Sequence, residues 1–229
     1  MLNLSNIEKL SKTMHIATLN IIREHLEMEV LYYMSQSRLA KEIIFYGGTA
    51  LRLAYHGPRF SEDLDFIFTH PPTPKAQTDL EYVLTMVVQH NIGVQLEEVI
   101  MKRWTLFGLL HITHAVLKHP IRLKVEITKR REKIRSQPVL LISPTTNKEV
   151  IFRCADLETL ATLKEKAIAQ RSAPRDWFDY WYLCNKLKTE PQPLRPFPFQ
   201  KRNFSNELKR WLPQNQWPII ASIITFYET

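Results

Sequence analysis

The chain has 229 residues, of which 45% are hydrophobic and 24% charged, and its formal net charge is +8. This length can bury a sizeable core, and the composition excludes a globally disordered chain. No apolar run reaches membrane-spanning length and no secretory leader pattern is present, so we expect a cytoplasmic protein that does not enter a membrane. The basic charge favours an acidic partner such as RNA, DNA or a nucleoside triphosphate.

The first elements in chain order are helical and then mixed. Residues 4 to 36 carry apolar side chains at intervals of three and four, which predicts one or two helices packed on the domain. An apolar, β-rich run at 42 to 46 then ends at Gly47 and Gly48, and residues 49 to 55 favour a helix. This pattern predicts a strand, a tight turn and a helix.

Such a turn is suited to phosphate. Glycine allows the backbone to approach a ligand closely, and the N-terminus of the following helix presents unpaired N–H groups. The hydroxyl of Thr49 adds a further donor. We therefore predict that Gly48 and Thr49 contact a nucleotide.

A pair of carboxylates follows the turn. Asp63 and Asp65 alternate with apolar residues, which predicts a strand with both acids on one face. Two carboxylates on one face repel each other unless a hard cation such as Mg²⁺ lies between them. Singly, paired glycines are most often an ordinary turn and Asp-x-Asp an exposed strand face. Together and in this order, they favour a site for both metal and phosphate.

The middle of the chain completes a mixed α/β pattern. We expect a helix at 75 to 90, followed by β-rich segments near 94 to 103, 105 to 117 and 121 to 128. In the last of these, apolar and polar residues alternate, so Glu126 points away from the apolar core. Glu126 could also be an ordinary exposed glutamate. The basic run 129 to 135 is either a solvated face or a contact to a polynucleotide backbone.

The last third of the chain reads as helical. Asp156 suits the N-cap of a helix to about Arg171, in which Lys164 lies within the apolar stripe and would point inward. Pro174 suits the first turn of the next helix, where Asp176 and Asp179 share a face. These two acids would either orient Lys164 and Arg171 through ion pairs or contact substrate directly.

The remaining C-terminal features are structural. The aromatic residues at 177 to 182 are predicted to be core, and four prolines at 191 to 198 indicate a stiff linker before a helical segment around 203 to 226. Cys154 and Cys184 lack metal-type spacing and are predicted to be reduced core thiols. We expect an α+β (mixed α/β) fold, divided into residues 1–152 with the catalytic core and residues 153–229 as a helical domain.

Two ordered blocks of this sequence resemble the AbiEii-type nucleotidyltransferases, a branch of the DNA polymerase β-like superfamily that includes toxins of toxin–antitoxin pairs. The first block joins Gly47-Gly48-Thr49 to Ser61-Glu62-Asp63-Leu64-Asp65-Phe66, and the second contains Lys164 and Ala167, then Arg171 and Arg175-Asp176-Trp177-Phe178-Asp179. The blocks span residues 43 to 183. The superfamily's usual Gly-Ser is Gly48-Thr49 here, which keeps the hydroxyl.

The resemblance implies a polymerase β-like core and a third metal-binding acid on a strand beside Asp65, for which Glu126 is the candidate. On this interpretation, Asp63, Asp65 and Glu126 bind Mg²⁺ or Mn²⁺ and carry catalysis together with Lys164. The triphosphate is bound by the nucleotide-binding residues Gly48, Thr49, Arg59, Lys164 and Arg171, and Asp176 and Asp179 support them.

The acceptor is open at this point. The family resemblance favours transfer of a nucleoside monophosphate to a tRNA 3′ end by a translation-blocking toxin, with a cognate antitoxin as partner. Transfer to a Ser, Thr or Tyr hydroxyl of a protein is the nearest alternative. From a different class, the chain could be a non-catalytic nucleic-acid-binding protein with this fold.

Overall fold

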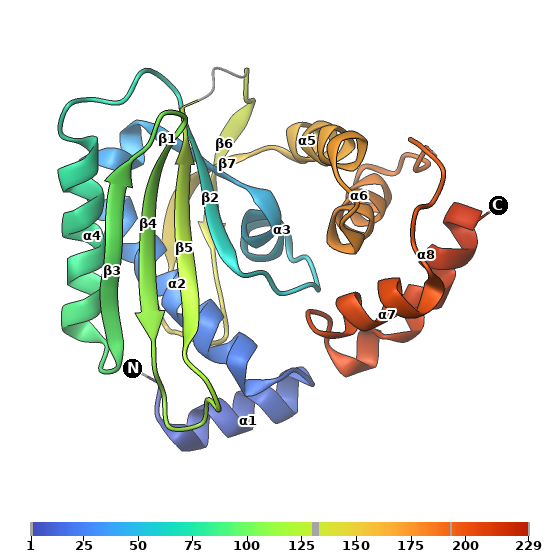
Figure 1. Cartoon of the computed structure of the whole chain (residues 1–229), viewed down its shortest axis with the longest axis horizontal. Coiled ribbons are helices and arrows are strands. Elements are labelled where there is room, and N and C mark those ends of the chain that lie inside the picture. The colour runs from blue at the N-terminus through green and yellow to red at the C-terminus, as the bar shows by residue number, and fades with distance from the viewer. Residues whose placement is uncertain (1, 130–132, 193, 229) are drawn as a thin grey trace.

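A mixed seven-stranded sheet organises the chain in the computed structural model, which describes residues 2–129, 133–192 and 194–228. The strand order is β3-β4-β5-β2-β1-β7-β6, and Figure 1 shows the last four helices on one side of this sheet. The arrangement confirms the expected mixed α/β fold.

The N-terminal region forms two helices, α1 (Leu4–Met14) and α2 (Thr18–Gln36). The side chain of Asn3 caps α1 by accepting from the N–H of Asn6 at 2.8 Å. His15 ends the helix in a left-handed conformation with φ 52°. A short 3₁₀ turn, Arg38–Lys41, then leads into the sheet. The alternative of two N-terminal helices is therefore the correct one.

The predicted strand, turn and helix are present as β1 (Ile43–Tyr46) and α3 (Gly47–Tyr55), followed by β2 (Asp63–Phe68). The helix begins two residues earlier than predicted, because Gly47 adopts a φ of 85° and turns the chain directly out of β1. β1 and β2 pair antiparallel at the centre of the sheet. Their buried side chains Phe45 and Phe66 stack with ring centroids 5.0 Å apart.

The next elements are α4 (Ala76–His90), β3 (Val94–Met101), β4 (Thr105–Ile112) and β5 (Ile121–Thr128). β4 is shorter than the predicted segment 105 to 117, since the chain leaves the ladder where the N–H of Thr113 donates to the carbonyl of Gly93. The apolar side chains of α4 and α2 share the main core with this half of the sheet. In Figure 1 no helix lies in front of β3, β4 and β5.

A hairpin of β6 (Ser136–Leu141) and β7 (Val150–Ala155) forms the other side of the sheet and was not predicted. β7 pairs parallel with β1. β6 is an edge strand, where Pro138 is tolerated. The expected boundary between residues 152 and 153 falls inside β7, and the division into two domains stays a prediction.

Four helices complete the chain: α5 (Leu157–Gln170), α6 (Pro174–Leu187), α7 (Lys201–Lys209) and α8 (Pro218–Glu228). The single helical segment expected at 203 to 226 is divided by a turn that contains a 3₁₀ stretch, Gln214–Gln216. Trp177 and Phe178 are buried in the core that these helices share, as predicted. Cys154 and Cys184 are buried and form no disulfide with each other.

A helix that crosses a bilayer must be about 20 residues long and predominantly apolar, and the helices of the described segments do not meet both conditions.

Candidate active site

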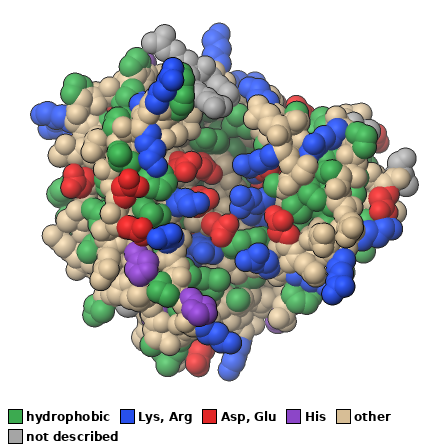
Figure 2. All heavy atoms as spheres, viewed as in Figure 1, with side chains coloured by type: hydrophobic (Ala, Val, Ile, Leu, Met, Phe, Trp, Pro, Cys, Tyr) green, Lys and Arg blue, Asp and Glu red, His purple; other side chains and the backbone are tan. Residues whose placement is uncertain are grey.

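A cavity of about 310 Å³ opens between the sheet and helices α5 and α6. Figure 2 shows this region as a hollow in which acidic and basic side chains gather. The side chains and backbone that line it come from segments far apart in the sequence: Tyr46, Gly47, Gly48, Arg59, Ser61, Asp63, Asp65, Glu126, Leu160, Leu163, Lys164, Ala167, Arg171, Arg175 and Asp176.

The three predicted acids lie together on one face of the sheet. β2 and β5 run parallel, and their register makes Asp65 and Glu126 cross-strand neighbours. Asp63 is two residues before Asp65 and therefore shares its face. Glu126 thus points away from the apolar core, as the alternation predicted, and the neighbouring strand brings it to the two aspartates.

Asp63 and Asp65 are not fully neutralised by the protein groups around them. Burial, reinforced by the charge of Asp63, raises the pKa of Asp65 to about 6. Burial also raises the pKa of Asp63, although the ammonium of Lys124 lies 3.9 Å from its carboxylate. A cation added beside Asp63 and Asp65 would therefore be favoured.

The donor set suits a hard divalent cation. Carboxylate oxygens are the ligands that Mg²⁺ and Mn²⁺ prefer, and three acids from two adjacent strands share this cavity. Across the described part of the chain, however, no three acidic, histidine or cysteine side chains already converge as a metal-ligand group. The fit to a metal therefore rests on the chemistry of the donors, and metal binding stays a prediction.

The two glycines make room for the site's own side chains. A Cβ on Gly47 would lie 2.5 Å from Oδ2 of Asp65, and its φ of 85° is itself unfavourable for other residues. A Cβ on Gly48 would lie 2.5 Å from Nη2 of Arg59 and 2.8 Å from Oγ of Ser61. Both glycines also line the cavity. The absence of a side chain at these positions therefore makes room for Asp65, Arg59 and Ser61 as well as for a ligand.

Thr49 is placed differently from the expectation. Its side chain is buried, and its hydroxyl donates to the backbone carbonyl of Asp63 at 2.6 Å. The hydroxyl proton is therefore not available to a phosphate in this arrangement. Thr49 instead ties the first turn of α3 to the start of the strand that carries the aspartates.

Arg59 is also engaged by protein. Its Nε and Nη2 atoms each donate to the carboxylate of Asp179 at 2.7 Å, and Nη1 donates to the carbonyl of Phe60 at 2.8 Å. Both charged side chains are almost fully buried. Arg59 thus joins the loop before β2 to α6, although part of it still reaches the cavity.

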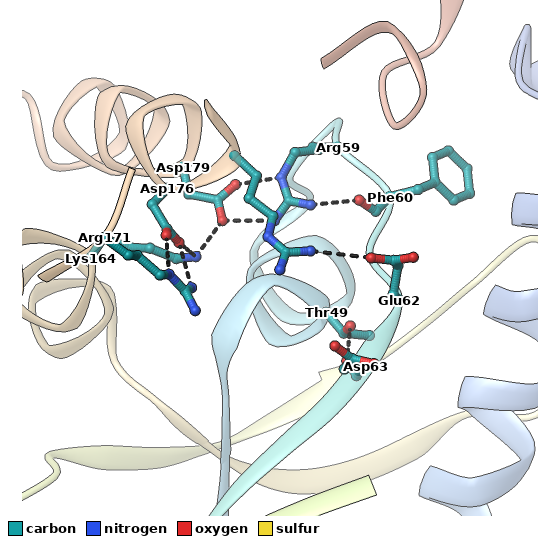
Figure 3. Close-up of polar contacts among 10 residues, drawn as sticks. Thr49, Arg59, Phe60, Glu62, Asp63, Lys164, Arg171, Asp176 and Asp179 are labelled. Atoms are coloured by element: carbon teal, nitrogen blue, oxygen red, sulfur yellow. Dashed lines mark hydrogen bonds and ion pairs between the residues drawn. The ribbon is translucent and has the colours of Figure 1, made fainter. Parts of the chain in front are cut away.

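Lys164 and Arg171 converge on the acids of α6, as Figure 3 shows. The ammonium of Lys164 lies 2.9 Å from Asp176 and 2.7 Å from Asp179. Arg171 donates to both carboxylate oxygens of Asp176, at 2.7 and 3.1 Å. Of the two alternatives, the structure contains the ion-pair network. Arg171 lies just beyond the end of α5 in extended backbone, so its position follows from Asp176 rather than from a helical stripe.

This network determines the charge of Asp176. Burial alone would raise the pKa of this carboxyl group, but Lys164 and Arg171 outweigh burial and lower it to about 2. The pKa of Asp179 is lowered as well, since Arg59 and Lys164 outweigh its burial. Both acids are therefore ionised at neutral pH, and they keep the two cations at the wall of the cavity opposite Asp65.

Arg175, which lines the cavity, and Lys124, which lies beside Asp63, are charged residues for which the sequence predicted no role. Arg175 donates to Glu62 at 3.2 Å, which joins α6 to the approach of β2. Lys124 faces Asp63 because it lies two residues before Glu126 on β5. The same alternation that pointed to Glu126 would have identified Lys124. The contact of Arg175 with Glu62 joins positions 113 residues apart and has no local signal.

The basic run 129 to 135 is only partly described. Residues 130 to 132 lie outside the described residues. Lys129 and Lys133 line a separate cavity of about 530 Å³ beside residues 68 to 72. A contact between this run and a polynucleotide stays a prediction.

Solved structures share this architecture. The JHP933 protein of Helicobacter pylori matches with a TM-score of 0.55 and 19% identity over 84% of this chain and 74% of its own. A candidate nucleotidyltransferase of the same organism matches with a TM-score of 0.55 and 18% identity over 92% of this chain and 83% of its own. At this identity the likeness establishes the fold, which is a nucleotidyltransferase fold.

The sequence comparison identifies the family. The family model described as nucleotidyl transferase AbiEii toxin, Type IV TA system, matches residues 29–209, and the chain belongs to this family. An uncharacterized Aquifex aeolicus protein, aq_aa25, is 28% identical over 166 residues, which are 70% of this chain and 66% of the relative. The chain thus spans slightly less than two thirds of that relative's length. Membership assigns the chain to a family described as nucleotidyl transferase toxins of type IV toxin–antitoxin systems.

Proposed function

We propose that this protein is a metal-dependent toxin that transfers a nucleoside monophosphate from a triphosphate to an acceptor hydroxyl, releasing pyrophosphate. The observation that carries the proposal is the pairing of Asp65 with Glu126 beside Asp63, opposite Lys164 and Arg171. The cavity thereby combines acids that suit a cation with cations that suit a triphosphate.

The proposed roles follow from these positions. Asp63, Asp65 and Glu126 would bind Mg²⁺ or Mn²⁺, which when bound activates the acceptor hydroxyl and offsets the charge of the leaving pyrophosphate. Lys164 and Arg171 would neutralise the triphosphate from the opposite wall. The backbone of Gly47 and Gly48, at the N-terminus of α3, would donate N–H groups to phosphate.

The positioning residues complete the assignment. Asp176 and Asp179 would orient Lys164 and Arg171, and Arg59 would fix α6 against the loop before β2. Thr49 would fix the spacing between α3 and β2. None of these four needs to contact the nucleotide to support transfer.

For the acceptor we propose a tRNA 3′ end, consistent with the net charge of +8 and with a toxin family whose name implies an antitoxin partner. Such a substrate places the protein in the cytoplasm. A protein hydroxyl is the second acceptor to test, because the same metal chemistry serves it. A non-catalytic nucleic-acid-binding role is the third.

The test incubates the purified protein with each α-³²P-labelled triphosphate, with Mg²⁺ or with EDTA, and with either total tRNA or a protein extract. We expect label on tRNA that depends on the divalent cation and is absent with Asp65→Asn. Label on protein would replace the tRNA acceptor with a protein. No label on either substrate, with any triphosphate, would contradict the transferase function.

A further inference from the structure

The wall of the candidate active site has an apolar part to which the proposed chemistry assigns no role. The apolar residues that line the cavity are Tyr46, Leu160, Leu163 and Ala167. Leu160 is 1% exposed and belongs to the core, whereas Tyr46, Leu163 and Ala167 are half-buried. Because these three residues line the cavity, part of the surface that the core leaves uncovered belongs to the cavity wall.

Tyr46 lies beside the acids because of the register of the sheet. In the β1–β2 ladder Tyr46 is the cross-strand partner of Asp65, which in turn pairs with Glu126. Directly opposite residues of an antiparallel pair stand on the same face, with Cβ atoms about 5 Å apart. Tyr46 is also the one aromatic residue among the described residues that line the cavity. Its side chain therefore borders the proposed metal site.

One face of α5 continues this wall toward the cations. Leu160, Leu163, Lys164 and Ala167 are spaced by three and four residues, so they share a face of the helix, and all four line the cavity. Tyr46 packs against the buried cluster that contains Leu160, which makes the sheet and helix parts of the wall continuous. A ligand along this wall would meet an apolar surface and a positive charge side by side.

This combination fits a whole nucleoside triphosphate. Its phosphates suit Lys164 and Arg171, as proposed above, and its base is a flat ring system that stacks on aromatic side chains. Small-molecule pockets commonly combine apolar and aromatic walls with a few polar groups that fix the orientation of the ligand. Since base and phosphates are joined through the ribose, the base needs an apolar wall next to the cations.

The acceptor has a different approach to the acids. Glu126 pairs on its other side with Phe107 of β4, and no helix lies in front of β3, β4 and β5 in Figure 1. That side of the acids is open to a polymer. Tyr46 lines the cavity between the sheet and α5, and its volume of about 310 Å³ suits a small molecule.

We infer that Tyr46, Leu163 and Ala167 form the subsite for the nucleobase of the triphosphate, which stacks on the ring of Tyr46. The inference rests on the proposed function for the identity of the ligand. Every base has a π-face, so this wall contributes affinity for all four nucleoside triphosphates and does not select among them.

The experiment compares ligands with and without a base. Isothermal titration calorimetry, with Mg²⁺ and no acceptor, gives Kd for ATP, CTP, GTP and UTP and for inorganic tripolyphosphate. Tyr46→Leu should raise Kd for the nucleoside triphosphates about 5- to 150-fold, the range expected for loss of one base–aromatic stack. Kd for tripolyphosphate should change less than about 2-fold, because this probe has no base.

Two further variants are the controls. Tyr46→Phe keeps the ring and removes only the hydroxyl, so Kd for each nucleoside triphosphate should stay within about 3-fold. Phe107→Leu is the matched change, because Phe107 is also half-buried and lies in the same row of the sheet, beyond Glu126. It should alter Kd for the nucleoside triphosphates less than about 2-fold.

Two outcomes would overturn the inference, provided that circular dichroism shows an intact fold. If Tyr46→Leu raises Kd for tripolyphosphate as much as for the nucleoside triphosphates, Tyr46 supports the shape of the site and does not contact the base. If Tyr46→Leu changes Kd for neither kind of ligand, the base lies elsewhere.

The two proposals fail separately. If Tyr46→Leu weakens binding of nucleoside triphosphates alone but no triphosphate labels RNA or protein, the base subsite stands and the transferase function is lost. If the protein transfers label and Tyr46→Leu binds nucleoside triphosphates as tightly as the unsubstituted protein, the transferase function stands and the subsite is refuted.

Discussion

Arg59 and Asp179 form a buried, bidentate ion pair between positions 120 residues apart, with both hydrogen bonds at 2.7 Å. The pair joins the loop before the aspartate strand to the helix that orients Lys164. Because Asp179 also contacts Lys164 at 2.7 Å, one carboxylate links both walls of the cavity. The geometry of the site therefore depends on residues that lie outside the proposed chemistry.

Asp179→Asn should lower the free energy of unfolding by about 3–5 kcal/mol, because it leaves Arg59 buried without its counter-charge. Urea denaturation followed by circular dichroism measures this. The control is Glu97→Ala, which removes the ion pair between Glu97 and Arg122. In this pair the side chain of Arg122 is 61% exposed and that of Glu97 is 38% exposed. That exposed pair should contribute less than about 1 kcal/mol. Equal losses of unfolding free energy in the two variants would show that the buried pair stabilises the fold no more than the exposed pair does.

Asp65→Asn and Glu126→Gln should each reduce transfer about 100-fold or more, since a metal site supplies several kcal/mol of transition-state stabilisation. Neither change should lower the melting temperature, because each removes one of three clustered like charges. Initial rates and thermal melts measure both effects. If a variant transfers at nearly the rate of the unsubstituted protein, the substituted residue is not a metal ligand.

Lys164→Met should raise KM for the triphosphate by about 10-fold or more, because a cation at the cavity wall is replaced by an uncharged side chain. Lys166→Met is the matched change on the exposed side of the same helix and should alter KM less than about 2-fold. Steady-state kinetics with varied triphosphate separates them. Similar KM values for the two variants would contradict the assignment of Lys164 to the nucleotide.

Asp176 should make stability sensitive to acid. Its pKa is lowered from 3.8 to about 2 in the folded chain, so its contribution is complete above about pH 4 and is lost as the pH falls toward 2. The difference in unfolding free energy between the unsubstituted protein and Asp176→Asn should accordingly shrink by about 2 kcal/mol over that interval. Urea titrations at several pH values measure it. A difference that is constant across the interval would contradict the lowered pKa.

Thr49→Val should affect stability more than nucleotide use. The substitution removes the hydrogen bond to the carbonyl of Asp63, which should cost about 1 kcal/mol or somewhat more at this buried position. KM for the triphosphate should stay within about 3-fold. Thr49→Ser retains the hydroxyl and serves as control. A large rise in KM without loss of stability would restore the predicted contact between Thr49 and phosphate.

Local patterns predicted the parts of the site that are local. The alternation around Asp63 and Asp65, and around Glu126, indicated which way each acid points, because a strand has a period of two. Their adjacency in space depends on β2 pairing with β5, and between these strands lie α4, β3 and β4. Only the family resemblance, and not the pattern of residues, anticipated that pairing.

The missed features have the same physical origin. Pro138 interrupts the strand pattern of β6, and the hairpin with β7 is recognisable only once an edge position is available to it. Thr49 and Arg59 have the chemistry of phosphate ligands. Nothing near them in the sequence indicates that Thr49 donates to the backbone carbonyl of Asp63, or that Arg59 pairs with Asp179. A side chain's type is local information, whereas its partner is determined by the fold.

The two walls of the cavity are made at very different times during synthesis. The acids are complete by Glu126, but Lys164, Asp176 and Asp179 follow later, and the backbone of Phe60 is bonded to that of Trp211, near the C-terminus. A nascent chain that ends before residue 164 therefore has the acids of the cavity without the cations of the opposite wall. The order of residues along the chain therefore delays assembly of the proposed site until the helices that carry Lys164 and Asp179 have been made.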